Sequence, residues 1–322
     1  MKKLLTLLVL SISSFSILSL GFAQDFPVTI EHKFGSTTIE ARPERVVTIG
    51  YTEQDALFTL GIQPIAIRYF YGDAPHAIFP WAVSEAGGHT PEVLNMAYGE
   101  LNLEKILSLQ PDVITAIGSG ITDAEYENLS RIAPTIAQSD AYVDFGVPWQ
   151  VEVRTLGEAL GERVRAEARV TALEAQLAAV RDAHPEFEGK RIAVAYRRAG
   201  DEGYGFYTAQ DGRGRFFEDL GFVVPEEHNE IAGDSFFAYI SEERLDLLDQ
   251  DLIVFLAIQF IGDDGQTVIR EDPLLNQLEA VQDGRVVYVK DEQDDALQFG
   301  TVLSIEFLLE NLVPELAAAL SN

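Results

Sequence analysis

The chain has 322 residues, with 23 lysines and arginines against 52 aspartates and glutamates, and a formal net charge of −29. A hydrophobic content of 47% excludes a disordered chain, and the negative charge argues against non-specific nucleic-acid binding. Cysteine is absent, which excludes disulfides and a lipid anchor attached through a cysteine. The length is ample for two domains.

Residues 1–23 have the pattern of an export signal. Lys2 and Lys3 precede an uncharged run from Leu4 to Leu20, and small residues near Ala23 provide a cleavage site. A retained membrane anchor is the alternative, because the run could just cross a bilayer. The many serines and the small residues favour cleavage near Ala23 and a soluble periplasmic protein. The mature chain then has 21 basic and 52 acidic residues, a charge of −31.

The first half alternates strands and helices. Alternating residues around Gly35 predict a hairpin over 26–39. Thr52 is a plausible N-cap and Gly61 a C-terminal stop for a helix over 53–60. The further expected strands cover 46–49, 65–67, 113–117 and 135–137, and the further expected helices cover 103–109 and 123–132.

The longest helical pattern runs from Pro148 to Asp182. Apolar residues recur at helical spacing in two stripes, Val153–Leu156–Leu160–Val164 and Val170–Leu173–Leu177–Val180. Gly157 and Gly161 weaken the first half, so we expect a break near Gly161. The part from Arg163 to Ala183 is then about 30 Å long and joins two lobes.

The second half repeats the strand–helix theme. We expect strands at 191–197, 252–257 and 285–289, an extended segment at 222–224, and a Gly- and Tyr-rich loop at 198–212. The expected helices cover 214–220, 242–248, 272–280 and 296–320, the last with a kink at Pro314.

This order predicts an α/β fold class with two Rossmann-like lobes, whose parallel sheets are flanked by helices and joined by one long backbone helix. The predicted divisions are a signal peptide at 1–23, an N-terminal ligand-binding lobe at 24–160, the connecting helix at 161–184 and a C-terminal ligand-binding lobe at 185–322.

Ligands of open α/β sheets lie beyond the carboxyl ends of the strands, and several arginines and aromatic residues are expected there. Arginine offers forked donors to carboxylate or hydroxamate oxygens, and aromatic rings offer flat stacking faces. An ordinary surface arginine or half-buried tyrosine is the alternative for each residue. The candidate ligand-binding residues are Tyr51, Arg68, Tyr69, Tyr71, Trp149, Arg197, Arg198, Tyr204 and Tyr207.

Motifs of catalysis are missing. The chain has no G-x-S-x-G elbow, no Walker A sequence and no H-E-x-x-H pair, and its five histidines are scattered. We therefore predict no catalytic residues, no resident metal and no cofactor. Acid pairs such as Asp263–Asp264 and Asp294–Asp295 are more typical of solvated turns than of acid/base catalysis.

Several segments resemble one family. The opening RPERVVTIGYTEQDALFTLGIQPIAI, the first-lobe LNLEKILSLQPDVI and the second-lobe ISEERLDLLDQDLIV are similar to periplasmic binding proteins of importers for iron–siderophores, haem and cobalamin. RYFYGD, FPWA, APTIAQS and GVPWQ are closer to the iron–siderophore branch. The resemblance covers about residues 41–320 and implies two lobes with small opening motions only.

The resemblance also implies how the protein meets a membrane permease. One glutamate on each lobe docks into arginine pockets of the permease, and by motif these are Glu104 and Glu243, with Glu242 as the neighbouring alternative. Without the family, an exposed glutamate favoured by the helix dipole is the simpler interpretation.

We therefore expect a periplasmic receptor, monomeric and not an enzyme, that captures a ferric siderophore and delivers it to an inner-membrane ABC permease. Arg68, Arg197 and Arg198 would neutralise an anionic complex. Haem or cobalamin binding is the alternative within the family. A secreted hydrolase using cleft carboxylates and a direct metal-ion binder with converging histidines and carboxylates are the alternatives of other classes.

Overall fold

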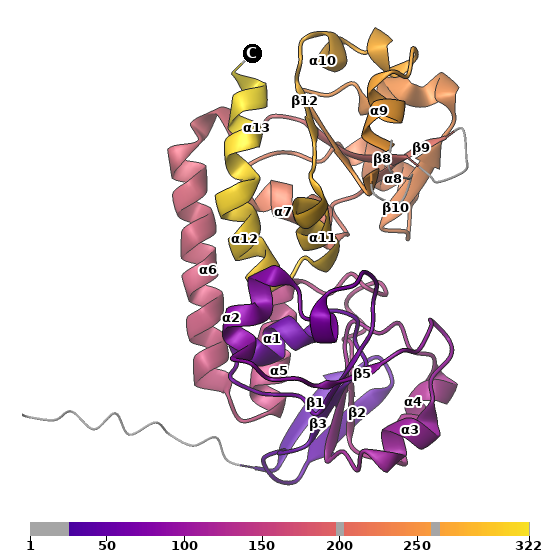
Figure 1. The fold of residues 1–322 in the computed structure, drawn as a ribbon, viewed down its shortest axis with the longest axis vertical. Coiled ribbons are helices and arrows are strands. Elements are labelled where there is room, and N and C mark those ends of the chain that lie inside the picture. Colours follow the sequence, from indigo (N-terminus) through magenta and orange to yellow (C-terminus); the bar gives the residue numbers. More distant parts are fainter. Residues whose placement is uncertain (1–25, 198–202, 259–264, 322) are drawn as a thin grey trace, which may run out of the picture.

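The computed structural model describes residues 26–197, 203–258 and 265–321. Two α/β lobes lie one above the other, and the long helix α6 (Arg163–Ala183) runs along one side of both (Figure 1). The predicted α/β class is therefore confirmed, and the bounds predicted for the long helix agree with those of α6.

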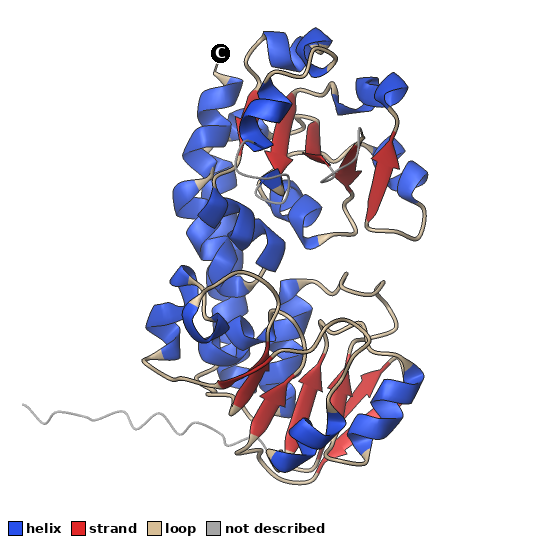
Figure 2. Cartoon of the chain, turned by 45° about the vertical axis from the view of Figure 1, so that its right-hand side comes forward, coloured by secondary structure: helices blue, strands red, loops and turns tan. Residues whose placement is uncertain are grey.

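The first lobe contains a sheet of five parallel strands in the order β5-β4-β3-β6-β7 (Figure 2). Its central strand β3 comes first in the chain, so the connections reverse direction between β3 and β6. Ligands of such sheets bind at this reversal point. The strands are β3 (Val46–Thr48), β4 (Ala66–Arg68), β5 (Glu92–Leu94), β6 (Val113–Ala116) and β7 (Thr135–Ala137).

Five helices and a hairpin complete this lobe. The predicted hairpin is present as an antiparallel pair that turns at Lys33–Phe34, directly before Gly35. Thr122 caps α4 through a reciprocal pair of hydrogen bonds with Glu125, which satisfies donors at the helix start. The hairpin strands are β1 (Val28–His32) and β2 (Gly35–Ile39), and the helices are α1 (Glu53–Thr59), α2 (Val83–Ala86), α3 (Leu103–Ser108), α4 (Asp123–Ser130) and α5 (Trp149–Ala159).

The second lobe has a mixed sheet in the order β10-β9-β8-β11-β12. Strands β8, β11 and β12 are parallel, while β9 pairs antiparallel with both β8 and β10. The loop expected over 198–212 is therefore wrong at Tyr204–Tyr207, which forms β9. The glycines around it hide a short aromatic strand that is stabilised by pairing on both edges. The strands are β8 (Ile192–Arg197), β9 (Tyr204–Tyr207), β10 (Phe237–Ile240), β11 (Leu252–Leu256) and β12 (Val286–Tyr288).

The C-terminal segment is three helices rather than one kinked helix. Gly300 ends α11 with a φ of +58°, and the Thr301 side chain caps the start of α12. Pro314 lies in the first turn of α13, where a missing amide donor does no harm, so it starts a helix instead of bending one. The helices of this lobe are α7 (Gly212–Asp219), α8 (Glu226–Ala232), α9 (Gly265–Arg270), α10 (Glu279–Gln282), α11 (Asp291–Phe299), α12 (Val302–Asn311) and α13 (Val313–Leu320).

Short 3-10 helices replace two expected α-helices. Residues 242–248 form η4 (Glu242–Leu248), and the segment expected as a helix over 272–280 contains only η6 (Leu275–Gln277) and the start of α10. The remaining 3-10 turns of the described ranges are η1 (Pro75–Ala77), η2 (Pro80–Ala82) and η3 (Pro185–Phe187).

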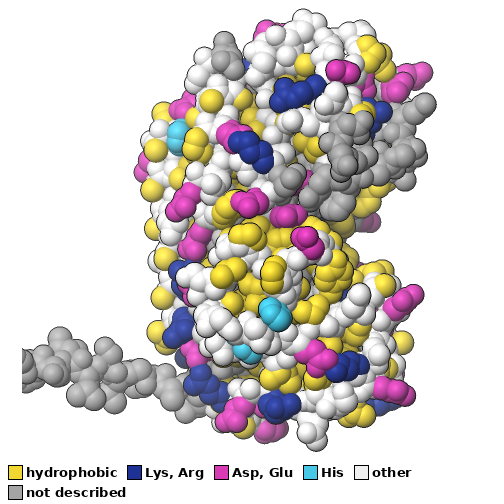
Figure 3. Space-filling model, viewed as in Figure 1, with side chains coloured by type: hydrophobic (Ala, Val, Ile, Leu, Met, Phe, Trp, Pro, Cys, Tyr) yellow, Lys and Arg dark blue, Asp and Glu magenta, His cyan; other side chains and the backbone are white. Residues whose placement is uncertain are grey.

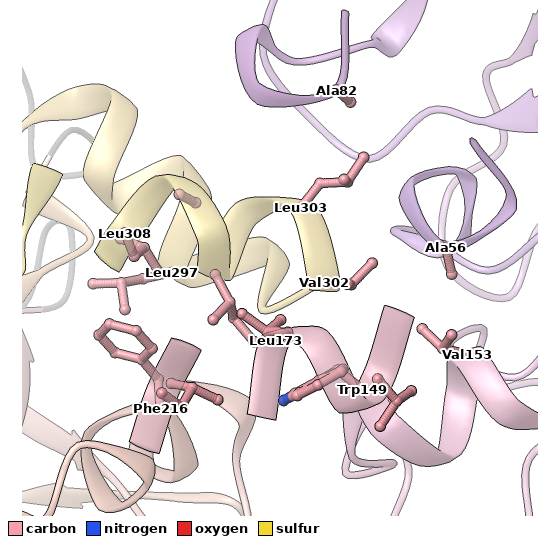
Figure 4. Close-up of a cluster of buried hydrophobic side chains, with 14 of the residues drawn as sticks. Ala56, Ala82, Trp149, Val153, Leu173, Phe216, Leu297, Val302, Leu303 and Leu308 are labelled. Atoms are coloured by element: carbon pink, nitrogen blue, oxygen red, sulfur yellow. The ribbon is translucent and has the colours of Figure 1, made fainter. Parts of the chain in front are cut away.

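One hydrophobic core continues from lobe to lobe. Figure 4 shows Ala56 of α1, Trp149 of α5, Leu173 of α6, Phe216 of α7 and Leu303 of α12 in a single buried cluster. The long helix therefore contributes to the core of both lobes, which is why its stripe of buried residues extends over several turns.

The predicted break between α5 and α6 is confirmed at Gly161, whose φ is +77°. Val164, expected in the first apolar stripe, is instead 72% exposed because the break rotates α6 out of phase with α5. The helices touch at Gly157, where an added Cβ would lie 2.3 Å from the Cβ of Ala166. Among the described residues, no helix is both long and apolar enough to cross a membrane.

This close helix contact yields a stability test. Replacing an interior helical glycine by alanine normally stabilises by about 1 kcal/mol, but we expect Gly157→Ala to lower the free energy of unfolding by about 1–3 kcal/mol because the new methyl overlaps Ala166. Urea unfolding measures the change. Gly212→Ala is the matched control, since no atom lies within 4 Å of the position that its new methyl would occupy. Adding Ala166→Gly to Gly157→Ala should recover part of the loss; equal losses with and without it would contradict the contact.

Candidate functional site

A cleft of about 740 Å³ lies between the lobes. Figure 3 shows the molecule hollowed between its two lobes, with hydrophobic side chains gathered around the hollow. The first lobe contributes Tyr51 and Thr52, which follow β3, and Ile117 and Gly118, which follow β6. These are the carboxyl ends of the two strands between which the sheet reverses direction, the position where the topology predicts a ligand.

The second lobe contributes the start of α7 and the turn between α11 and α12. Asp211, Gly212 and Arg213 approach from α7, and Gln298 to Thr301 approach from the turn. The cleft is rich in aromatic side chains, which are suited to a large ligand with flat or apolar surfaces. The aromatic lining residues are Tyr51, Phe70, Tyr98, Phe145, Trp149, Phe216, Phe236 and Phe299.

Arg68, expected to contact the ligand, lies beneath the cleft and is 1% exposed. Its guanidinium donates to the carbonyl oxygens of Met96 at 2.9 Å and Ala97 at 2.5 Å. The same group lies 4.2 Å from the ring centroid of Tyr51. Burial lowers the pKa of the guanidinium, but the carbonyls and the ring compensate its charge. Arg68 therefore supports Tyr51 from below and does not line the cleft.

The second-lobe arginine expected at the cleft is also engaged elsewhere. Arg197 Nη1 lies 3.3 Å from Asp272 Oδ2, and the same carboxylate oxygen accepts from the Tyr204 hydroxyl at 2.6 Å. Neither Arg197 nor Tyr204 is among the described residues that line the cleft. Arg198 lies outside the described residues.

The other predicted aromatic residues divide into lining and supporting side chains. Trp149, at the first position of α5, lines the cleft, as Tyr51 does. Tyr207 lies behind Arg213, with the guanidinium carbon 3.7 Å from its ring centroid. The Tyr69 hydroxyl donates to the Gly72 carbonyl oxygen at 2.7 Å, and Tyr71 packs against Phe299 with ring centroids 6.2 Å apart. Tyr69, Tyr71 and Tyr207 do not line the cleft.

Three arginines that the sequence did not single out line the cleft, namely Arg154 on α5 and Arg213 and Arg215 on α7. Arg213 and Arg215 lie in the first turn of α7, directly after the loop that follows β9. The rule that functional residues follow strands leads to them only once β9 is recognised as a strand. The glycines around β9 favour a loop instead, so the sequence does not indicate that Arg213 and Arg215 follow a strand.

Two glutamates form an acidic floor where the lobes meet. Glu53 is fully buried and accepts from the Thr48 hydroxyl at 2.8 Å and the Gly118 amide at 2.7 Å. Glu152 of α5 lines the cleft beside it. Burial raises the pKa of Glu152 well above its ordinary value, and the charges of Glu53 and Asp55 raise it further. Burial also raises the pKa of Glu53, opposed by its hydrogen bonds.

The lobes are joined by a buried carboxylate and an aromatic cluster. Asp55 Oδ2, on α1, accepts from Trp81 Nε1 at 2.8 Å and from the Thr301 hydroxyl at 2.6 Å. The aromatic cluster consists of Phe70, Tyr71, Phe79, Trp81, Phe299 and Phe307, and its ring centroids across the lobes are as close as 4.5 Å. Asp55 therefore links the first turn of α1 in one lobe to the α12 cap of the other.

The two glutamates expected at a permease are both exposed, one on each lobe. Glu104 lies in the first turn of α3 and Glu243 in the first turn of η4, next to the exposed Glu242. Within the described ranges, no group of three or more histidines, cysteines, aspartates or glutamates is arranged to hold a metal ion.

Comparison with known proteins agrees with this geometry. The sequence pattern of the family described as "Periplasmic binding protein" matches residues 73–293. The ferric-anguibactin-binding protein FatB of Vibrio anguillarum is 26% identical over 301 residues, which cover 89% of this chain and 87% of FatB. The Fe(3+)-citrate-binding protein YfmC of Bacillus subtilis is 27% identical over 80% of this chain and 76% of YfmC.

Solved structures of similar proteins superpose over almost the whole chain. A periplasmic solute binding protein from Mycobacterium smegmatis has a TM-score of 0.81 at 30% identity and covers 91% of this chain and 99% of its own. Streptococcus pneumoniae PiaA in complex with ferrichrome has a TM-score of 0.78 at 28% identity, covering 91% and 98%.

The buried Asp55 yields a pH prediction. Burial raises the pKa of Asp55 from 3.8 to about 6. The folded state therefore binds a proton on the Asp55 carboxyl more tightly than the unfolded state does. This proton binding stabilises the folded protein below about pH 4, and the stabilisation is lost as the pH rises to about 6. We expect the free energy of unfolding of the wild type to fall relative to Asp55→Asn over this window, by about 2–3 kcal/mol. Urea unfolding at several pH values measures this difference, and parallel curves would contradict it.

Proposed function

The chain belongs to the periplasmic binding protein family, and we propose that it captures a ferric siderophore between its lobes and delivers it to an ABC permease of the inner membrane. The cleft carries this proposal, because it has room for part of a large ligand and is lined, within the described part of the chain, by eight aromatic side chains. The names of the similar proteins support iron chelates as the ligand class: ferric anguibactin, Fe(3+)-citrate and ferrichrome.

The signal-like residues 1–23 support export to the periplasm, and the extracytoplasmic sites of related binding proteins agree with this. We propose further that the protein acts as a monomer, without a resident cofactor or metal. The divisions at 24–160, 161–184 and 185–322 are proposed as the two ligand-binding lobes and their connecting helix.

Haem or cobalamin is the second candidate ligand within the family, because flat aromatic faces would also stack on a macrocycle. A hydrolase is less well supported. The acid pair in the cleft could suggest one, but Glu53 is fully buried and both of its oxygens accept hydrogen bonds from the protein. It could therefore not reach a substrate, and a two-carboxylate mechanism needs both groups at the reacting bond.

Ligand capture can be tested by tryptophan fluorescence. A ferric siderophore bound beside Trp149 should quench its emission, and Phe145→Ala should weaken binding by about tenfold through lost ring contact. Val223→Ala, an exposed apolar residue away from the cleft lining, is the control. If hydroxamate, catecholate and citrate chelates all leave the emission unchanged, while haem or cobalamin shifts its absorbance on binding, the ligand assignment must change.

Docking to the permease can be separated from ligand capture. We propose that Glu104 and Glu243 pair with permease arginines, so Glu104→Gln and Glu243→Gln should reduce uptake into cells while leaving the Kd for ligand unchanged, since neither side chain is among the residues that line the cleft. Glu85→Gln is the control, because Glu85 is an exposed acid on α2 outside both motifs. Uptake of labelled iron measures the effect, and normal uptake by both variants would contradict the docking assignment.

A further inference from the structure

The side chains that line the cleft do not give it a net positive charge. Among the described residues, four acidic side chains and three guanidinium groups line it. Two further buried acidic side chains, Glu53 and Asp55, lie behind this lining near Glu152, and burial raises the pKa of all three, which favours their neutral forms. The lining groups are Glu152, Glu174, Asp211 and Asp219 on the acidic side and Arg154, Arg213 and Arg215 on the basic side.

Arg213, the most enclosed of the three arginines, is already neutralised. Its Nε and Nη2 donate to the two oxygens of Asp211 at 2.6 and 2.7 Å, and its Nη1 donates to Gln298. This forked pair occupies the Nε/Nη2 edge of the guanidinium, and Gln298 takes a hydrogen bond from the remaining nitrogen, Nη1. A ligand anion would have to displace Asp211 or leave it as a repelling charge.

The other two arginines are engaged as well. Arg154 makes a forked pair with Glu167, at 2.8 and 3.0 Å. Arg215 Nη1 donates to the carbonyl oxygen of Gln210 at 2.7 Å, and its charge faces the carboxylates of Asp211 and Asp219. Each lining arginine therefore has an acidic partner or neighbour that belongs to the protein.

Burial between the lobes strips water from a ligand, so an uncompensated charge on that ligand is expensive to bury. A highly anionic chelate needs cations that are free to pair with it. This cleft offers aromatic rings and arginines that are already paired, in a chain whose net charge is −29. The lining thus suits a chelate with an apolar surface and no excess negative charge. Arg68 and Arg197, which were expected to neutralise an anionic ligand, lie outside it.

We propose that this cleft selects ferric chelates without net negative charge, of the uncharged or cationic trihydroxamate type, over anionic tricatecholate and citrate chelates. The inference rests on the proposed siderophore function and narrows its ligand class. The paired arginines act as hydrogen-bonded walls of the cleft, and the Asp211 carboxylate, which already neutralises Arg213, disfavours the anions.

The test is a comparison of Kd values for the mature chain with ferrichrome and ferrioxamine B, ferric enterobactin and ferric citrate. At low salt we expect the two hydroxamates to bind at least about tenfold tighter than the two anions. Raising the salt to about 1 M should narrow this gap, because charges are then screened within about 3 Å. Equal or tighter binding of the anions would overturn the inference and leave the proposed function intact. Failure of all four to bind would instead contradict the proposed function.

A variant isolates the role of charge. Asp211→Asn frees Arg213 and should tighten binding of ferric enterobactin and ferric citrate several-fold, while its thermal unfolding confirms that the variant is folded. Asp219→Asn, which relieves Arg215, is the second variant if the first does not fold. Glu188→Gln is the matched control, because Glu188 pairs with Arg181 on the exposed surface away from the cleft lining. Unchanged anion binding in the folded variant would overturn the electrostatic explanation.

Discussion

The relation between the two lobes depends on one buried carboxylate. Asp55 is 1% exposed, and its Oδ2 holds the Trp81 indole of one lobe and the Thr301 hydroxyl of the other. Removing such a group from water is unfavourable, and these two hydrogen bonds to Oδ2 offset only part of that cost, because burial still raises the pKa of Asp55 to about 6. The bond to Thr301 would be lost if the lobes separated, so the carboxylate fixes where α12 begins relative to α1. The aromatic cluster packs around this contact and excludes water from it.

A preformed cleft follows from this arrangement. A wide opening of the lobes would expose the aromatic cluster together with the core that runs through Trp149, Leu173 and Phe216. Each buried aromatic side chain covers about 150–250 Å², so such an opening is strongly unfavourable. Phe299 belongs to both the aromatic cluster and the cleft lining. The contact that holds the lobes together therefore also shapes the wall that faces the ligand.

Apolar periodicity and the residues that mark helix and strand boundaries predicted most of the architecture. The hairpin, the alternation of strands and helices, and the bounds of α6 follow from local patterns that the tertiary structure does not override. The errors occurred where local patterns are ambiguous. Tyr204–Tyr207 is a strand because β8 and β10 pair with it, and the apolar run after Ala296 is divided by a glycine with positive φ and a new cap at Thr301. Pro314 correctly indicated a helix boundary, but the prediction of a kink was wrong, because the proline lies in the first turn of a new helix.

The candidate site was less predictable than the fold. Tyr51 and Trp149 are predictable because they follow a strand and begin a helix, positions that topology brings to the cleft. Whether an arginine faces a ligand or a protein carbonyl depends on segments distant in the chain. Arg68 meets Met96 and Ala97, and Arg197 meets Asp272, and no local pattern indicates those partners.

The position of Arg68 has a consequence for how this protein could change its ligand over evolution. Its guanidinium ties the end of β4 to the segment after β5 and carries the ring of Tyr51 above it. Lysine has no planar fork and could not make the same set of contacts. The backbone carbonyls that Arg68 binds therefore constrain both Arg68 and the position of the Tyr51 ring. New ligand specificities would arise more readily at the rim of the cleft. There Phe145 and Tyr98 are 39% and 61% exposed, so substituting them removes little buried contact.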